Sequence, residues 1–302
     1  MTTGAPTTGA LPTGALPSGA TEPSGVTEPS GATEPSGATQ PSGAPEHTGA
    51  PHPAGAPDLK DLSADGQRAL DAWHADREGF VTSPLGNLAL VQTVWSGPGD
   101  PEVPDEEARA GWPAHAALTR LSRTNIDSGE TEHGYRIWLQ DSPANQAFER
   151  IESYDYDPSW VLDATFEHVD DGRTIPFEHI RDAGASRALP VSGDLVFSRG
   201  GTTYRMSAFD TSGRLQLVFG DPTNGSETYG AGRFLYVDLP GDAADRVPGT
   251  VIPLRIDFNR AFVPPCGFST GMNCPLPPRQ NRFAEAVRAG EKRVVFRDGF
   301  TL

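Results

Sequence analysis

Residues 193–219 read GDLVFSRGGTTYRMSAFDTSGRLQLVF, and this stretch decides the fold class. Apolar and polar residues alternate through three short runs, which is the pattern of strands with one buried face and one wet face. Between the first two runs, Gly200 and Gly201 suit a two-residue hairpin turn because both can adopt a positive φ. That turn sets Leu195 opposite Met206. The stretch therefore predicts a three-stranded antiparallel meander.

Further strands and two helices are expected on either side of the meander. Strand-like apolar runs cover 85–95, 135–139, 160–169, 232–239 and 250–258. Helical periodicity covers 63–80 and 281–290, and Ser63 and Asn281 are candidate N-caps of these helices. The fold class is therefore mainly β, with an N-terminal helix and a short C-terminal helix. An antiparallel barrel and an antiparallel sandwich fit the pattern equally.

One face of the expected N-terminal helix carries three polar side chains. His74, Arg77 and Glu78 are spaced i, i+3 and i+4, so they converge on one side of the helix. Such a trio is more often a solvated or lightly hydrogen-bonded face than a site. We therefore expect a solvated or lightly hydrogen-bonded face here.

The first part of the chain differs in composition from the rest. From Thr21 a six-residue unit of the type TEPSGA repeats, and large aromatic or branched aliphatic residues are almost absent. Such a tract buries too little apolar surface to offset the entropy of ordering, about 1–2 kcal/mol per residue. Residues 1–57 are therefore expected to be a disordered tail, either solubilising or a surface spacer. Residues 58–302 are expected to form a single β-rich domain.

Charge argues against two classes of partner. The chain has 24 Lys and Arg against 40 Asp and Glu, a formal net charge of −16. Such a surface repels phosphate backbones and anionic lipid, so we expect no nucleic acid and no membrane partner. We find no apolar run of about 18 residues, as a membrane span needs, and no secretory signal pattern. A cytoplasmic location is expected, and the pattern indicates no particular oligomeric state.

Three strings resemble a known family, the bacterial domain-of-unknown-function family 1684: WHADREGFVTSPLGNLALVQTVW, GDPTNGSETYGAGRFLYVDLP and IDFNRAFVPPCGFSTGMNCPLPPRQNRFAEAVRAGEK. The resemblance extends over 73–292, although 96–146 resembles no string of the family. The family has no established biochemical function, so the resemblance implies none. The positions that match its strings are Thr228, Tyr229, Gly230, Gly232, Arg233, Asp257, Asn259, Pro265, Cys266, Cys274, Pro275, Pro278, Asn281 and Arg282.

The two cysteines, Cys266 and Cys274, lie in a proline-rich loop and allow several interpretations. A thiolate nucleophile needs a base, and no histidine is close to either cysteine in the sequence. Zinc needs four ligands, and the C-x7-C spacing is not that of a zinc knuckle, so no metal is expected. A disulfide would contribute about 2–3 kcal/mol, yet a cytoplasm would keep it reduced. Packing of two buried thiols is preferred, and a disulfide or a reactive thiol stays open.

Polar residues near two strand ends form the candidate site. Asp257 and Asn259 share one face of the strand expected over 250–258, and Tyr229 and Arg233 precede the neighbouring strand-like run. If the two strands pair, Arg233 reaches Asp257 in a bidentate ion pair. The same contacts would also serve to pin a loop to the sheet. The candidate ligand-binding residues are Tyr229, Arg233, Asp257, Asn259, Cys266, Cys274, Asn281 and Arg282.

The sequence thus favours a small-ligand-binding or structural β domain with no cofactor, whose expected partner is a small molecule. The alternative is a hydrolytic or thiol-based enzyme that uses Tyr229, Arg233, Asp257 and Asn259, with Cys266 as nucleophile or redox thiol. We find no serine elbow, HExxH, dinucleotide-binding or P-loop string to support a specific reaction. Both functions therefore stay open.

Overall fold

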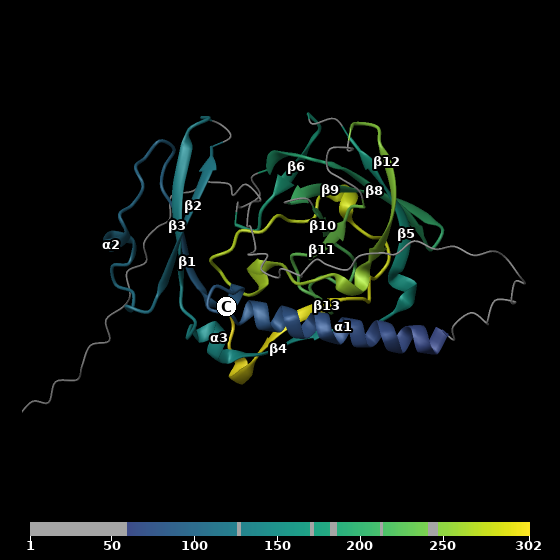
Figure 1. The fold of residues 1–302 in the computed structure, drawn as a ribbon, viewed down its shortest axis with the longest axis horizontal. Helices are drawn as coiled ribbons and strands as arrows, with labels where there is room; N and C mark the ends of the chain where they lie inside the picture. Colours follow the sequence, from purple (N-terminus) through teal and green to yellow (C-terminus); the bar gives the residue numbers. More distant parts are fainter. Residues whose placement is uncertain (1–58, 126–127, 170–171, 182–185, 212–213, 241–246) are drawn as a thin grey trace, which may run out of the picture.

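The computed structural model describes residues 59–125, 128–169, 172–181, 186–211, 214–240 and 247–302. The tail predicted over 1–57 lies outside the described residues. The described chain is mainly antiparallel β-structure in four sheets, with three α-helices and several 3-10 turns around them (Figure 1). The mainly β fold class is therefore confirmed.

The centre of the molecule is a six-stranded antiparallel sheet. In order across the sheet its strands are β11 (Arg233–Asp238), β10 (Arg214–Phe219), β9 (Thr202–Thr211), β8 (Gly193–Arg199), β5 (Val161–His168) and β12 (Val251–Asp257). The predicted meander forms β8, β9 and β10, and Leu195 pairs with Met206 as expected. Gly200 and Gly201 have φ of 57° and 79°, the positive values that a two-residue hairpin turn of type I′ requires.

This sheet curls into a half-barrel, and a returning segment of chain meets its free edge. After β12 the chain turns through η4 (Phe258–Arg260) and crosses to the opposite edge strand, β11. There the N–H of Phe234 donates to the carbonyl of Phe262 at 3.0 Å, and the N–H of Phe262 donates back at 2.8 Å. The curled sheet and this bridge favour the barrel over the sandwich (Figure 1).

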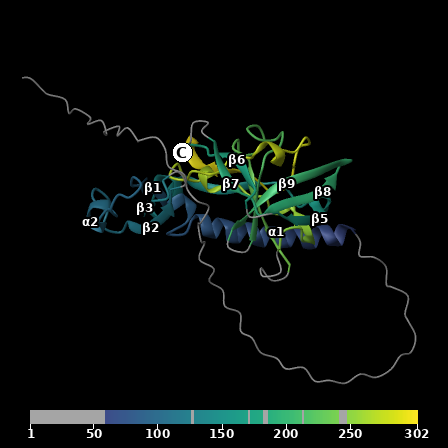
Figure 2. The same ribbon diagram turned by 90° about the horizontal axis from the view of Figure 1, so that it is seen from above.

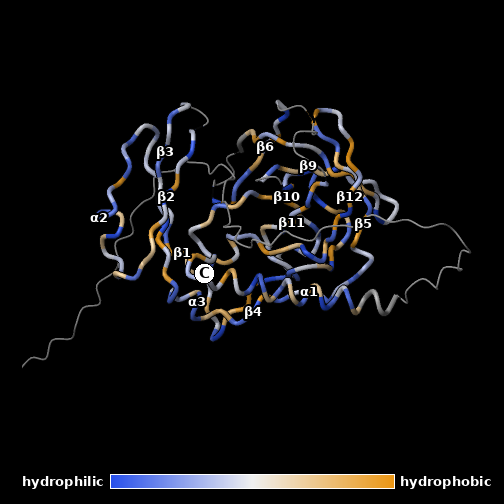
Figure 3. The backbone as a smooth tube through the Cα atoms, viewed as in Figure 1, coloured by the Kyte–Doolittle hydropathy of each residue, from blue (hydrophilic) through white to orange (hydrophobic). Residues whose placement is uncertain are grey.

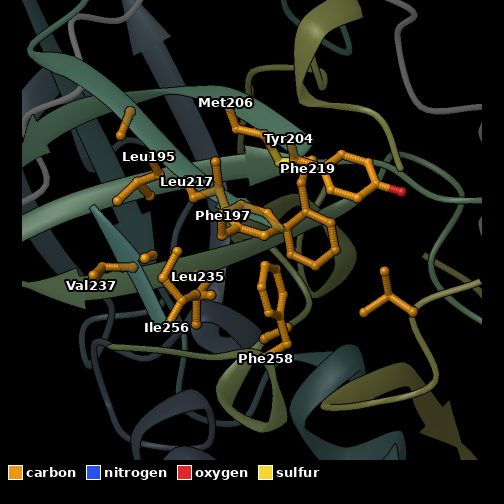
Figure 4. Close-up of a cluster of buried hydrophobic side chains, with 14 of the residues drawn as sticks. Leu195, Phe197, Tyr204, Met206, Leu217, Phe219, Leu235, Val237, Ile256 and Phe258 are labelled. Carbon is orange, nitrogen blue, oxygen red and sulfur yellow. The ribbon is translucent and has the colours of Figure 1, made fainter. Parts of the chain in front are cut away.

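Aromatic side chains fill the inside of the half-barrel (Figure 4). Phe197, Tyr204, Phe219 and Phe258 surround Phe283, which the C-terminal segment inserts from outside the sheet. The ring centroid of Phe283 lies 4.7 Å from that of Tyr204 and 5.3 Å from that of Phe258. Aromatic pairs at these distances add stability beyond their buried area. In the described part of the chain, this interior is thus a packed aromatic and aliphatic core.

Smaller elements surround the half-barrel. A long helix, α1 (Leu59–Val81), runs alongside it and is largely hydrophilic, whereas hydrophobic stretches recur in the strands of the central sheet (Figures 1 and 3). Two small sheets pair β4 (Phe148–Ser153) with β13 (Glu291–Phe296) and β6 (Thr174–Glu178) with β7 (Ser186–Pro190). None of the described helices is long and apolar enough to cross a membrane.

A three-stranded sheet stands to one side of the half-barrel in both ribbon views (Figures 1 and 2). Its strands, in order, are β1 (Leu90–Trp95), β3 (Thr131–Trp138) and β2 (Ala117–Thr124). The helix α2 (Asp105–Ala108) lies in the connection between β1 and β2, and α3 (Pro143–Ala147) leads into β4. Two of its strands, β2 and β3, lie within the segment 96–146, which resembled no string of the family.

The structure corrects three expected boundaries. The helix α1 begins at Leu59, so Ser63 lies inside it and is not its N-cap. The expected strand over 85–95 starts with a 3-10 turn, η1 (Asn87–Ala89), and is extended only from there onward. The expected C-terminal helix over 281–290 is wrong, since these residues are irregular after the 3-10 turn η6 (Arg279–Asn281).

Candidate functional site

The pair expected between Arg233 and Asp257 is wrong. Their strands, β11 and β12, lie at opposite ends of the six-strand order, so the strand pairing on which this contact depended does not occur. Arg233 instead donates from Nη2 to Oδ2 of Asp221 at 2.9 Å, and both side chains are fully buried. Asp257 accepts the N–H of Asn259 at 3.0 Å and so caps the turn η4.

Arg233 joins separate segments of backbone at one end of the half-barrel. Its Nη1 donates to the carbonyl of Ala289 at 2.5 Å, and its Nη2 donates to that of Val287 at 2.7 Å. Asp221 accepts in turn from the N–H of Val287 at 3.1 Å and from the hydroxyl of Thr223 at 2.6 Å. Burial lowers the pKa of Arg233, and Asp221 opposes that shift by favouring the charged form. These contacts hold the segment 281–290 out of a helical conformation, because its carbonyls bind the guanidinium.

Asn281 replaces a piece of strand pairing with its side chain. The ladder between β9 and β10 ends at the pair of Phe209 and Gln216, and the same register continued places Ser207 opposite Val218. Asn281 occupies that position: its Oδ1 accepts the N–H of Ser207 at 2.8 Å. Its Nδ2 donates to the carbonyls of Ser207 and Val218 at 2.8 and 2.9 Å. The side-chain amide thus joins two strands that have separated.

Asn259 makes a similar bridge to the loop before β5. Its Oδ1 accepts the N–H of Asp157 at 2.8 Å, and its Nδ2 donates to the carbonyl of the same residue at 3.0 Å. Arg282 is exposed and donates from Nη2 to the carbonyl of Pro277 at 3.1 Å. The described contacts of Arg233, Asn259, Asn281 and Arg282 are therefore contacts that hold the backbone. A ligand-binding role for them stays a prediction.

Tyr229, Cys266 and Cys274 are the candidate residues that the fold brings together. Neither cysteine is in a disulfide, both are buried, and the N–H of Cys266 donates to Sγ of Cys274 at 3.2 Å. The hydroxyl of Tyr229 donates to the carbonyl of Cys266 at 3.1 Å. The pKa of Cys266 is lowered, first by the hydrogen bond from Cys274 and then by Tyr229 and Arg181, although burial opposes this. Burial and the neighbouring Cys266 raise the pKa of Tyr229, so the phenol stays protonated.

A pocket outside this predicted cluster lies between α1 and the outer face of β10 and β11. Its volume is about 130 Å³. Three arginines and three aromatic residues line it: Trp73, Arg77, Arg214, Tyr236, Arg260 and Phe262. We call these six residues the arginine–aromatic pocket.

Charged and aromatic groups lie in sequence along one wall of the arginine–aromatic pocket. The guanidinium carbon of Arg77 is 4.7 Å from the ring centroid of Phe262. The centroids of Phe262 and Tyr236 are 5.1 Å apart, and the guanidinium carbon of Arg214 is 5.0 Å from the centroid of Tyr236. Each distance falls within the range of cation–π or aromatic contacts. Two adjacent rings are therefore flanked by a guanidinium on each side.

The three arginines differ in how firmly the protein holds them. The side chain of Arg77 is 13% exposed and donates from Nε to Oε1 of Glu291 at 2.9 Å, and Glu291 is fully buried. Arg214 is 52% exposed and pairs with the exposed Asp238. Arg260 is 53% exposed, and its Nε lies 3.9 Å from Oδ2 of Asp257. Arg77 is therefore a fixed base of the pocket, and the other two are solvent-exposed groups at its mouth.

The sequence carried only a partial signal for this pocket. Arg77 belongs to the polar trio on α1, where a solvated or lightly hydrogen-bonded face was expected, and two members of the trio are hydrogen-bonded to other segments. Arg77 binds Glu291, and Oε1 of Glu78 accepts the N–H of Ile151 at 2.8 Å. Arg214 belongs to the polar face of the meander, but its proximity to Tyr236 depends on the pairing of β10 with β11. In the described part of the chain, no group of three or more His, Cys, Asp or Glu is placed to hold a metal ion.

Comparison with known proteins places the chain in a family. The family model described as protein of unknown function (DUF1684) matches residues 146–292, a segment that runs from α3 into β13 and contains the half-barrel. A solution NMR structure of an uncharacterized protein of Haloarcula marismortui is 30% identical, with a TM-score of 0.38; the match covers 48% of this chain and 77% of that one. No curated protein matches the chain. The chain belongs to the DUF1684 family of proteins of unknown function.

Proposed function

We propose that this protein binds a small organic anion with a flat apolar group in the arginine–aromatic pocket. The observation that carries the proposal is the lining, in which three guanidinium groups meet three aromatic rings and none of the six residues is acidic. On a chain with a net charge of −16, these guanidinium groups supply positive partners for an anion, and each of them also faces one carboxylate, Glu291, Asp238 or Asp257. Guanidinium groups match the planar geometry of carboxylate and the oxygens of phosphate.

The size and shape of the pocket limit the ligand. Pockets for drug-sized ligands have volumes of roughly 300–1,000 Å³, whereas this one has about 130 Å³. That volume suits a single ring, or one flat group, rather than a nucleotide. The neighbouring rings of Tyr236 and Phe262 offer a surface against which a flat group packs. An aromatic carboxylate or an aryl phosphate is the chemical class that fits best.

The exposed arginines are suited to exchange partners on binding. Arg214 pairs with Asp238, whose side chain is 80% exposed, and exposed ion pairs contribute at most about 1 kcal/mol. A ligand anion can therefore replace Asp238 at little cost. Arg77 keeps its buried partner Glu291, which offsets its charge, so it forms a fixed base of the pocket that does not have to move on binding.

An enzyme that uses all of the predicted side chains together finds no support in this geometry. Arg233 contacts Asp221, and Asn259 contacts Asp157, so neither faces Cys266. Only Tyr229 lies beside that thiol. A binding protein is therefore the function that we favour, and the thiols are considered separately below.

Titration of the full chain with benzoate, phenyl phosphate and inorganic phosphate tests this proposal. We expect calorimetry to detect the two aryl anions more strongly than inorganic phosphate, with affinity that falls as salt rises. Arg214→Ala and Arg260→Ala should each weaken binding by about tenfold or more, which corresponds to the loss of one charge-assisted hydrogen bond of roughly 1.5 kcal/mol.

Arg255→Ala is the matched control, because Arg255 is a 72% exposed arginine on β12 that is outside the pocket lining. Its affinity should equal that of the unaltered chain. Two results would count against the proposal: no aryl anion binds at millimolar concentration, or Arg255→Ala weakens binding as much as the two pocket variants do.

A further inference from the structure

The proline-rich loop that holds Cys266 and Cys274 is anchored at both cysteines. Cys266 lies in the 3-10 turn η5 (Pro265–Gly267), and the hydroxyl of Tyr229 donates to its carbonyl. The carbonyl of Cys274 accepts the N–H of Ile180 at 3.0 Å, where the chain that continues β6 pairs with the loop. The relative position of the two thiols is thus set by the body of the protein.

The two sulfur atoms are within reach of each other. Sγ of Cys274 lies 3.2 Å from the backbone nitrogen of Cys266, an atom only three bonds from the sulfur of Cys266 itself. Rotation about side-chain bonds is therefore enough to bring the sulfurs toward the S–S distance of about 2.05 Å. The two residues are 8% and 6% exposed. That limited access favours a small oxidant over a bulky protein disulfide.

The surroundings of Cys266 make its thiolate form easier to reach than that of an ordinary buried thiol. Sγ of Cys274 accepts the N–H of Cys266 and the hydroxyl of Tyr229 donates to the Cys266 carbonyl, so both groups lie close to Cys266. Together with the positive charge of Arg181 they lower the pKa of its thiol. Arg181 is held beside the loop, because its Nε donates to the carbonyl of Met272 at 3.0 Å. Since thiolates are the nucleophiles in thiol chemistry, Cys266 is the cysteine that attacks and Cys274 the one that resolves.

We infer that Cys266 and Cys274 form a redox-active dithiol, which a small hydroperoxide converts reversibly into an intramolecular disulfide. The sulfur of Cys266 attacks the peroxide, so that an S–O bond forms, the O–O bond breaks and an alcohol or water leaves with the thiol proton. Cys274 then attacks the sulfenic acid, so that the S–S bond forms and water leaves. The two sulfurs together lose two electrons, and the peroxide gains them.

Intact-mass measurement on the full chain tests the inference. The reduced protein is treated with one equivalent of hydrogen peroxide, then denatured and exposed to N-ethylmaleimide. We expect a monomer whose mass is lower by two hydrogen atoms and which takes up no maleimide, with both thiols restored by dithiothreitol. Because the chain has 2 cysteines, this result identifies the bridge. A product with both thiols free, one with added oxygen only, or a disulfide-linked dimer would overturn the inference.

Three variants assign the roles. Cys274→Ser should stop at the sulfenic acid and be labelled by dimedone, whereas Cys266→Ser should react far more slowly. Tyr229→Phe should slow oxidation by up to about tenfold, the change in thiolate population that one pKa unit produces. Tyr156→Phe is its control and should keep the rate of the unaltered chain. Equal rates for Cys266→Ser and the unaltered chain would refute the assignment, provided that circular dichroism shows both folded.

Discussion

Arg233 keeps its charge inside the protein only because its partners are fixed. Both it and Asp221 are fully buried, and the guanidinium also binds the carbonyls of Val287 and Ala289. A buried ion pair is not necessarily more stabilising than an apolar pair, but removal of one partner leaves an uncompensated charge. At the scale of single residues, we therefore expect the stability of the fold to be highly sensitive to substitution of either member of this pair.

Replacement of Arg233 by alanine should lower the free energy of unfolding by about 3–5 kcal/mol, because the carboxylate of Asp221 is left buried alone. Urea unfolding measures the loss. Removal of the exposed pair of Arg255 and Asp163, 72% and 93% exposed, should cost less than about 0.5 kcal/mol and serves as control. Equal effects of Arg233→Ala and Arg255→Ala would mean that the buried pair does not hold the fold.

The residues that matter for the candidate site were partly predictable, but their partners were not. The resemblance to the family singled out Arg233, Asn259 and Asn281, and each makes several buried hydrogen bonds. Each of these residues, however, bonds to partners on another element. Asn281 fills a gap between the strands β9 and β10, and strand-pairing rules alone do not reveal that gap. A side chain that replaces backbone pairing has no local signature in the sequence.

Among the elements, the turn before β11 depends on the absence of a side chain. Gly232 has φ of 89°, and a Cβ there would lie 2.6 Å from the carbonyl oxygen of Phe219 and would overlap the ring of Pro277. Gly201 in the hairpin has a similar φ of 79°, but a Cβ there would meet nothing within 4 Å. The two glycines thus share backbone strain and differ in crowding.

Gly201→Ala should cost about 1–2 kcal/mol of unfolding free energy, the strain of a left-handed alanine. Gly232→Ala should cost at least about 2 kcal/mol more, because the backbone near β10 must move. Denaturant unfolding of both variants gives the difference. If the two losses are equal, the contact with Phe219 and Pro277 does not restrict the turn.

The pairing of β13 with β4 makes the stability of the fold depend on pH. Glu152 of β4 accepts hydrogen bonds from Nζ of Lys292 at 2.8 Å and Nε of Arg293 at 2.7 Å. These two bonds lower the pKa of Glu152 to about 2 from its ordinary 4.5. Since the folded-state pKa is depressed, the stabilisation is present above the unfolded pKa and is lost as the pH falls through the folded one.

Glu152→Gln should therefore lower the urea midpoint at neutral pH, and the gap from the unaltered chain should close between about pH 4.5 and about pH 2. Because the pair is at the surface, the gap should correspond to at most about 1 kcal/mol. Unfolding curves at several pH values measure it. A gap that stays constant down to about pH 2 would show that the stabilisation is not electrostatic.

The elements themselves were predictable where their contacts are local. The meander β8–β9–β10 follows from alternation and from the two turn glycines, and its register was correct at Leu195 and Met206. The order of the remaining strands depends on crossings between distant segments, so the sequence did not reveal that β11 and β12 lie at opposite ends of the sheet. The segment 281–290 has helical periodicity, but its carbonyls bind Arg233, and tertiary contacts overrode the local preference.

At the scale of the whole molecule, the arginine–aromatic pocket depends on two distant parts of the chain. The helix α1 supplies Trp73 and Arg77, and the remaining lining residues come from 214–262. The family match covers 146–292, so it includes the mouth of the pocket and not its base. Ligand binding should therefore hold α1 against the half-barrel.

The way the chain returns from β12 to β11 also bears on self-association. An open sheet exposes unpaired N–H and C=O groups at both edges, and these can recruit strands of another molecule. The bridge of Phe262 to Phe234 occupies part of the edge at β11. At the other edge, β12 contains Pro253, which lacks an N–H to offer, followed by the charged Arg255 and Asp257. Each edge of the half-barrel thus resists growth into fibrils by a different device.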